Sequence, residues 1–186
     1  LKVFFLSKPA VGEIDLLTRL NLSNKILIIS SIMLFYFLPF LTNKNFINNY
    51  FKNNLNYKNI FFSFFLVSIS IHFFSYDLAF TGGGIFFQLS NFIFQNNILF
   101  YLICYASILL VLIMWNVSIN NKLIILCLII SNPQLTIYHK YFDPLLIILF
   151  FLLFYFKYEI QRIINLKFIK FLYFFYLSFL ALNYLK

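Results

Sequence analysis

The sequence predicts an all-α protein, a polytopic transmembrane helical bundle of about six membrane segments that include short or re-entrant helices. Hydrophobic residues make up 63% of the 186 residues and charged residues only 10%, which gives a mean hydropathy of +0.91. The apolar residues stand in continuous runs, whereas half-buried strands alternate apolar and polar residues. We therefore expect residues 1–186 to form a single transmembrane domain.

The N-terminal segment, residues 1–25, is more polar than the rest of the chain. Its apolar residues are mixed with acidic and basic ones in a loosely amphipathic order. Such a segment suits a helix that lies at the membrane interface, and a plain connecting loop is the equal alternative. Because the chain begins with Leu1 and not with methionine, we expect a fragment of a longer protein.

The first clear membrane segment is 26–41, and a polar, asparagine-rich link follows at 42–59. A second segment covers 60–74, and within it His72 shares one helical face with Ser68 and Ser75. Polar residues in membrane helices usually face the bundle interior. His72 is therefore a candidate proton relay or substrate ligand, with a hydrogen-bonded contact between helices as the alternative.

Residues 75–97 form a turn-rich link in which Asp77 is the one charged residue. Three consecutive glycines, 82–84, permit backbone conformations that other residues avoid and allow another group to approach closely. The spacing of a phosphate-binding glycine loop is absent, so a structural turn is favoured. The following run, 85–94, is too short to span a bilayer and predicts an interfacial or re-entrant helix.

Residues 98–115 form the third membrane segment, and a hairpin with a polar tip follows at 122–157. As helices, the arms of the hairpin would be about 14 and 20 Å long, less than the roughly 30 Å of a hydrocarbon core. The tip, residues 132–143, therefore dips below the headgroups or extends the helices. A last segment is expected at 171–185.

The basic residues indicate which side each loop faces. Eight Lys and Arg residues fall in the loops 42–59, 116–122 and 157–170, whereas the opposite loops contain only Lys140. The positive-inside rule places the basic loops in the cytoplasm and the tip outside. The net charge of +9 therefore predicts contact with a lipid bilayer and not with nucleic acid, in an integral protein of the bacterial inner (plasma) membrane.

The tip concentrates the chemistry of the chain. His139 and Lys140 make a cationic patch for a phosphate or carboxylate, Tyr138 adds a hydroxyl donor, and Asp143 can orient His139. Gln134 belongs to the same segment. The alternative is that Lys140 and Asp143 form a plain ion pair across three residues. The spacing of the residues indicates no metal site, cofactor or catalytic residue.

The run HKYFDPLL, which starts at His139, resembles the His-Lys-acid, aromatic, proline pattern that opens a late membrane helix in some GT-C superfamily glycosyltransferases. The resemblance implies the C-terminal part of an enzyme that transfers a hexose or mannose from a polyprenyl-phosphate donor on the extracytoplasmic face. His139 and Lys140 would contact the donor phosphate or the acceptor. Tyr141 stands where the pattern has an acid, and the loop that carries the family's catalytic acid has no counterpart here.

Two other classes of function stay open. In a transporter or channel, His72, Asp77, Lys140 and Asp143 would line a permeation or proton path. In a non-catalytic membrane subunit, the tip would carry no site. The sequence indicates neither the donor and acceptor nor the oligomeric state.

Overall fold

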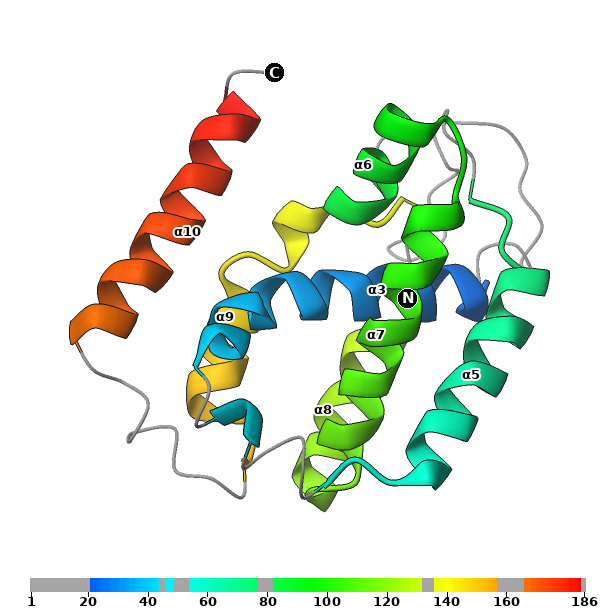
Figure 1. Ribbon diagram of the computed structural model, residues 1–186, viewed down its shortest axis with the longest axis horizontal. Coiled ribbons are helices and arrows are strands. Elements are labelled where there is room, and N and C mark those ends of the chain that lie inside the picture. Colours follow the sequence, from blue (N-terminus) through cyan, green and yellow to red (C-terminus); the bar gives the residue numbers. More distant parts are fainter. Residues whose placement is uncertain are drawn as a thin grey trace, which may run out of the picture.

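The computed structural model describes residues 21–43, 46–48, 54–76, 82–131, 136–156 and 166–184. Every element of regular secondary structure in these ranges is a helix (Figure 1). The predicted all-α class is therefore confirmed for this part of the chain. The elements are α3 (Leu22–Phe37), η1 (Leu38–Thr42), α5 (Tyr57–His72), α6 (Gly84–Phe94), α7 (Ile98–Trp115), α8 (Ile119–Ile130), η2 (His139–Tyr141), α9 (Leu145–Leu152) and α10 (Leu166–Tyr184).

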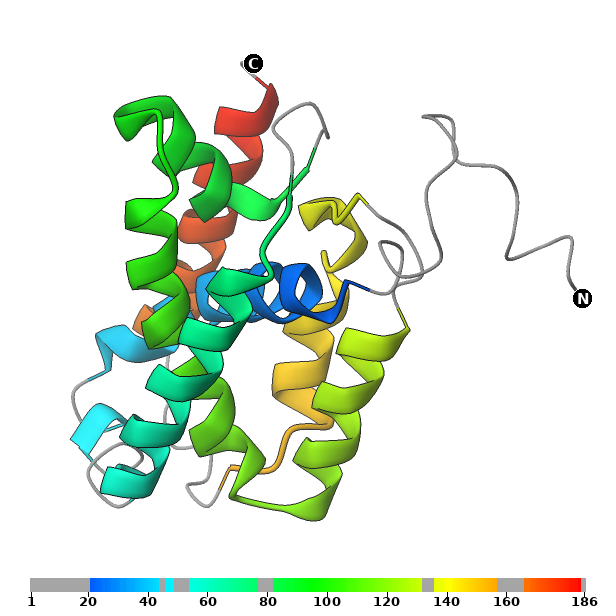
Figure 2. The same cartoon turned by 90° about the vertical axis from the view of Figure 1, so that its right-hand side faces the viewer.

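Helix α3 is the centre of the molecule and is buried along most of its length. It lies crosswise to α5, α7, α8, α9 and α10, which run roughly parallel to one another (Figures 1 and 2). The N-cap Asn21 accepts a hydrogen bond from the backbone N–H of Asn24, which satisfies one free donor of the first turn. The helix ends where Pro39 begins the tighter turn of η1.

The helices that cross α3 bring their ends together at two poles of the molecule. At one pole the Asn116 amide after α7 donates to the Asn59 side chain of α5 at 2.9 Å. At the same pole the Asn121 side chain of α8 accepts from the Tyr155 N–H and donates to the Tyr155 carbonyl after α9. Described parts of two of the loops predicted to share a side, 42–59 and 116–122, are thus adjacent.

The other pole contains the end of α5, α6 and the start of α9 (Figure 1). Phe74, which follows α5, packs against Phe100 at the start of α7, with ring centroids 5.5 Å apart. Gly83, which precedes α6, is joined by a backbone hydrogen bond to Ile137 of the tip. The tip and the glycine turn therefore lie at the same pole, as the alternation of segments predicts.

Two helices, Leu22–Thr42 and Ile98–Trp115, are long and apolar enough to cross a membrane. Length and apolar composition are features that membrane helices share with the core helices of soluble proteins. The six predicted membrane segments are not established, because among the described helices just these two have that length and composition. Most of the predicted interfacial segment 1–25 lies outside the described residues.

The predicted segments differ from the helices mainly at their ends. The segment 98–115 is confirmed to the residue, whereas the arms of the hairpin become Ile119–Ile130 and Leu145–Leu152. The first arm is therefore longer than predicted, about 18 Å, because Ser118 caps it by accepting from the Asn121 N–H. The second arm is shorter, about 12 Å, since α9 has eight residues, from Leu145 to Leu152.

Helix α10 lies at the edge of the molecule, beside η1 (Figure 1). Aromatic side chains make its contacts. The Tyr176 hydroxyl donates to the Tyr36 carbonyl at 2.8 Å, and Phe175 and Phe179 pack on the ring of Phe35. Helix α10 therefore covers the end of α3 that carries Phe35 and Tyr36.

Candidate functional site

The glycine turn and the tip of the hairpin form one unit. The Gly83 N–H donates to the Ile137 carbonyl at 2.9 Å, and the Ile137 N–H donates to the Tyr76 hydroxyl at 3.4 Å. The Gln88 amide donates to the Gly82 carbonyl at 3.0 Å and braces the turn against α6. These hydrogen bonds fix the tip relative to the first turn of α6.

Glycine is required in this turn for two reasons. Gly82, Gly83 and Gly84 have φ angles of +123°, +79° and +78°, in the region that side chains with a Cβ atom avoid. A Cβ atom on Gly82 would also lie 2.8 Å from the Ile137 carbonyl oxygen. The structure thus supports the structural turn favoured from the sequence, and the turn allows the tip to approach.

His139 points inward from the tip. Its imidazole stacks on the ring of Tyr36, with centroids 5.0 Å apart and planes 25° apart. The rings of Phe35 and Phe179 complete the surroundings, at centroid distances of 5.1 and 5.0 Å. We call these four side chains, Phe35, Tyr36, His139 and Phe179, the His139 cage.

Both ring nitrogens of His139 are buried and have no hydrogen-bond partner. Burial disfavours the charged form and lowers the pKa of His139 from its ordinary value of 6.5 to about 4. The imidazole is therefore neutral at pH 7. A neutral ring among aromatic side chains does not attract an anion, so this conformation does not support the predicted cationic patch with Lys140.

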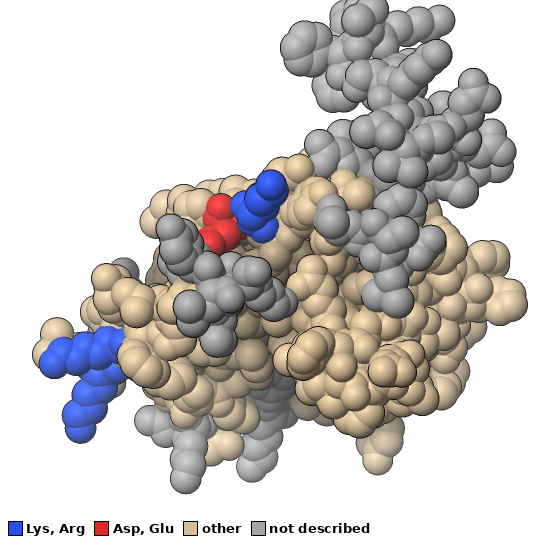
Figure 3. All heavy atoms as spheres, turned by 90° about the horizontal axis from the view of Figure 1, so that it is seen from above, with Lys and Arg blue, Asp and Glu red and all other residues tan. Residues whose placement is uncertain are grey.

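Lys140 points the other way, to the surface. Its ammonium group lies 4.9 Å from the ring centroid of Tyr138 and 5.7 Å from that of Tyr141. The two tyrosine rings meet edge to face. Figure 3 shows a basic side chain beside an acidic one on a face that otherwise carries few charges. Lys140 is thus an accessible cation held by two aromatic faces.

Asp143 lies at the entrance to α9 and is the one acidic residue in the described part of the chain. Its carboxylate interacts electrostatically with the hydroxyls of Tyr36 and Tyr176. It does not complete a hydrogen bond to the buried Tyr36 hydroxyl, and within the described residues it forms no ion pair with Lys140. The Lys140–Asp143 ion pair, which is the alternative that the sequence leaves open, is therefore not formed in this conformation.

Of the remaining predicted site residues, His72 is the one in the described part of the chain. His72 ends α5 as an exposed side chain whose ring packs on Phe73, and it does not join the tip. Ser75, predicted on the same helical face, instead contacts the Asn21 side chain before α3. Asp77 and Gln134 lie outside the described residues.

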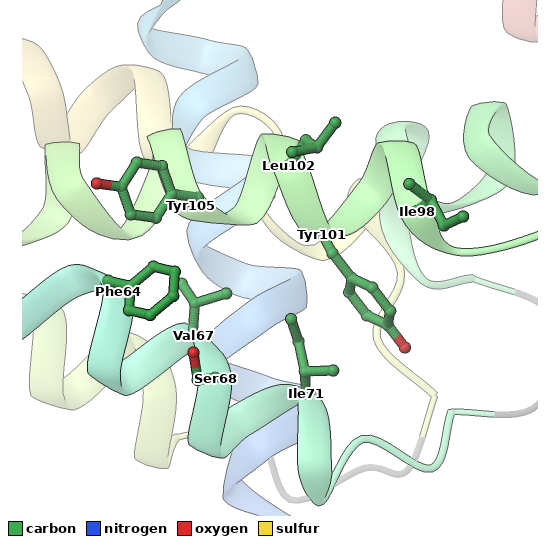
Figure 4. A pocket seen from close by; sticks show the side chains of 8 residues that line it. All are labelled: Phe64, Val67, Ser68, Ile71, Ile98, Tyr101, Leu102 and Tyr105. Carbon is green, nitrogen blue, oxygen red and sulfur yellow. The ribbon is translucent and has the colours of Figure 1, made fainter.

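An apolar groove of about 470 Å³ runs between α5 and α7, apart from the tip (Figure 4). Its walls are almost entirely carbon, and the hydroxyls of Tyr101 and Tyr105 point away from one another. The lining residues are Phe64, Val67, Ser68, Ile71, Ile98, Tyr101, Leu102 and Tyr105. The groove offers space for an apolar chain but no polar group that would do chemistry.

Sequence reasoning missed Tyr36 and Tyr176, which the structure places around the tip. Tyr36 is inside an apolar run, and the chain has 13 tyrosines, so neither residue stood out. A tyrosine inside a long apolar run is the one signal that could have marked Tyr36, because its hydroxyl needs a polar neighbour where it is buried.

Comparison with protein-family models, with curated proteins and with solved structures finds no match. The chemistry of the tip therefore carries the functional argument. Within the described residues, no three His, Cys, Asp or Glu side chains come together as a metal ion would require.

Proposed function

We propose that this chain belongs to an integral membrane glycosyltransferase of the GT-C type, which transfers a sugar from a polyprenyl-phosphate donor on the extracytoplasmic face. The observation that carries the proposal is Lys140, an exposed cation held between two tyrosine rings. An ammonium group binds phosphate as a point charge. Aromatic faces beside it suit the apolar face of a sugar ring.

The surface of the described helices supports contact with lipid. Large apolar side chains are exposed along α5, α6, α7 and α10. Among the most exposed are Phe61, Phe64, Phe92, Leu102, Tyr173 and Phe174. Contiguous exposed apolar surface is unusual for a soluble monomer and normal for a protein in a bilayer. A lipid-linked donor would reach Lys140 from the bilayer around these helices.

The test is sugar transfer by membranes that contain the protein expressed from its full reading frame, as Lys140→Ala, Lys140→Arg, Lys167→Ala or unmodified protein, with a labelled polyprenyl-phosphate hexose as donor. Lys167 is the control, because it is an exposed lysine of α10 outside the tip. A charge-assisted contact is worth roughly 1.5–3 kcal/mol, so Lys140→Ala should lower transfer by about tenfold or more. Lys140→Arg should retain most activity.

Unchanged transfer by the Lys140→Ala protein, at normal membrane levels, would remove the phosphate site from the tip. Equal losses in Lys140→Ala and Lys167→Ala would show a general effect of surface charge. Absence of transfer by the unmodified protein with any lipid-linked hexose would remove the enzymatic proposal itself.

A proton-coupled transporter is the second candidate, and one observation favours it. The Tyr36 hydroxyl and both His139 nitrogens are buried without partners, an arrangement that a proton path through the protein would use. Reconstituted protein would then move protons with a solute across vesicle membranes. Sugar transfer without proton uptake favours the enzyme. Proton uptake with a solute and without sugar transfer favours the transporter.

A further inference from the structure

His139 is part of the contact that holds α10 against the rest of the molecule. Its ring contacts Tyr36 and Phe35 of α3 and also Phe179 of α10, and Phe179 packs on Phe35 as well. The Tyr176 hydroxyl of the same helix donates to the Tyr36 carbonyl. Helix α10 is at the edge of the fold (Figure 1), where Phe168 on Phe40 and Phe175 on Phe35 make further ring contacts, so the His139 cage is one part of its attachment.

The cage accommodates a neutral imidazole but not a cation. A protonated ring would need acceptors for two N–H groups, and both nitrogens are buried without any. Titratable and charged groups stand on every adjoining element: Lys25 and Tyr36 of α3, Lys167, Lys170, Tyr173 and Tyr176 of α10, and Tyr138, Lys140, Tyr141 and Asp143 of the tip. Asp143 interacts with the Tyr36 and Tyr176 hydroxyls, and desolvation alone acts on His139.

We infer that His139 is a proton-binding site that controls the docking of α10, so that protonation of the imidazole releases this helix and exposes the His139 cage. Helix α10 is released because water can reach and hydrate the imidazolium only when this helix moves away. The remaining walls are α3, the central helix of the fold, and the tip, which the glycine turn fixes. The inference does not depend on the proposed function.

The direction of the pH effect follows from the shifted pKa of His139, which is about 4 when α10 is docked and ordinarily 6.5. Between these values the undocked state binds a proton that the docked state does not. Docking is therefore fully favoured above pH 6.5 and is lost progressively as the pH falls toward 4. At pH 5 the docking equilibrium should be about 30-fold weaker than at pH 7.5.

Distance measurements between spin labels on α10 and α7 test this inference in the full chain. Tyr173 and Leu102 are exposed positions for the labels, in a Cys127→Ser background, since Cys104 is buried. The distance should lengthen or broaden at pH 5 relative to pH 7.5. A His139→Phe protein should keep one distance at both pH values, because phenylalanine preserves the ring and cannot be protonated.

His72→Phe is the matched control, because His72 is the other of the two histidines and lies outside the cage. This variant should respond to pH as the unmodified protein does. A distance that stays constant in the unmodified protein between pH 7.5 and pH 4 would overturn the inference. The same pH response in His139→Phe would overturn it as well, since another group would then be titrating.

A second measurement does not require His139→Phe to fold. In ¹⁵N-histidine-labelled His72→Phe protein, NMR observes His139 alone. Its pKa should lie well below 6, and Tyr176→Ala, which removes a contact of α10, should raise the pKa toward 6.5. A His139 that titrates near 6.5 in the intact protein would contradict the site.

Discussion

Gly82 shows how one residue sets the position of the tip. Its φ of +123° is costly for any residue with a Cβ atom. Added bulk would also meet the Ile137 carbonyl, a backbone atom that the hydrogen bond from Gly83 holds in place. Gly84 differs, because a Cβ atom there meets the side chain of Ile32 at 3.1 Å.

Gly82→Ala should therefore destabilise the protein by about 2–3 kcal/mol, the range for a strained backbone combined with a steric clash. Gly84→Ala should cost less, because a side chain can shift where backbone cannot. Thermal unfolding in detergent, followed by the fluorescence of Trp115, measures both. Equal losses for the two variants would show that strain in φ alone, without the clash, determines the requirement for glycine.

Some residues of the candidate site could be predicted from the sequence and others could not. Lys140 and Asp143 stand out because charged residues are scarce in apolar sequence, and both do lie at the tip. Whether a neighbour such as His139 points inward depends on the turn of η2 and on α10, which are unrelated to local composition. For the same reason Tyr36 and Tyr176 could be recognised only in three dimensions.

The crossing of α3 and α7 shows how small polar residues join two apolar helices. Ser30 of α3 and Cys104 and Ser107 of α7 are buried at this crossing. The Ser107 hydroxyl lies 3.1 Å from that of Ser30, and the Cys104 thiol lies 3.6 Å from the Leu27 carbonyl. Small side chains let the helix backbones approach, and the hydroxyls add hydrogen bonds between helices.

Ser107→Leu should separate α3 from α7 and destabilise the fold by about 1–3 kcal/mol, because the crossing has no room for a larger side chain. Ala106→Leu is the matched control, since Ala106 is the exposed neighbour on the same helix and should be tolerated. Chemical unfolding monitored by circular dichroism compares the two proteins. If both unfold alike, the crossing is looser than the buried serines indicate.

The existence of a helix was easier to predict than the residues at which it begins and ends. The run 98–115 is uniformly apolar between Asn97 and Asn116, so its limits are visible in the composition. Just before the predicted hairpin, by contrast, Asn121 lies in the first turn of α8 and also binds the backbone of Tyr155. This pairing spans 34 positions of the chain, and no local pattern reveals it.

The arrangement of the whole molecule could be predicted only in part. Alternating apolar segments indicate which ends meet, and the two poles agree with that pattern. Hydropathy does not indicate orientation, since α3 and α7 both have the length and composition of membrane helices and yet cross one another (Figures 1 and 2). Two crossed helices cannot both stand upright in a bilayer. The more buried of the two, α3, is the better candidate to lie within the protein along the membrane plane.

This reasoning predicts the depth of each helix end in a lipid bilayer. Spin labels at Leu22 and Thr42, the exposed ends of the α3–η1 unit, should report the same depth, because the helix lies flat. Labels at Ile98, the first residue of α7, and Ile119, an exposed residue shortly after its end, should lie near opposite interfaces, because α7 is about 27 Å long. Relaxation by oxygen and by a water-soluble nickel complex measures these depths in vesicles of the Cys127→Ser protein. Labels at Leu22 and Thr42 that face opposite sides would instead make α3 the upright helix, and the tip would then lie at the side of the bundle and not at one of its ends.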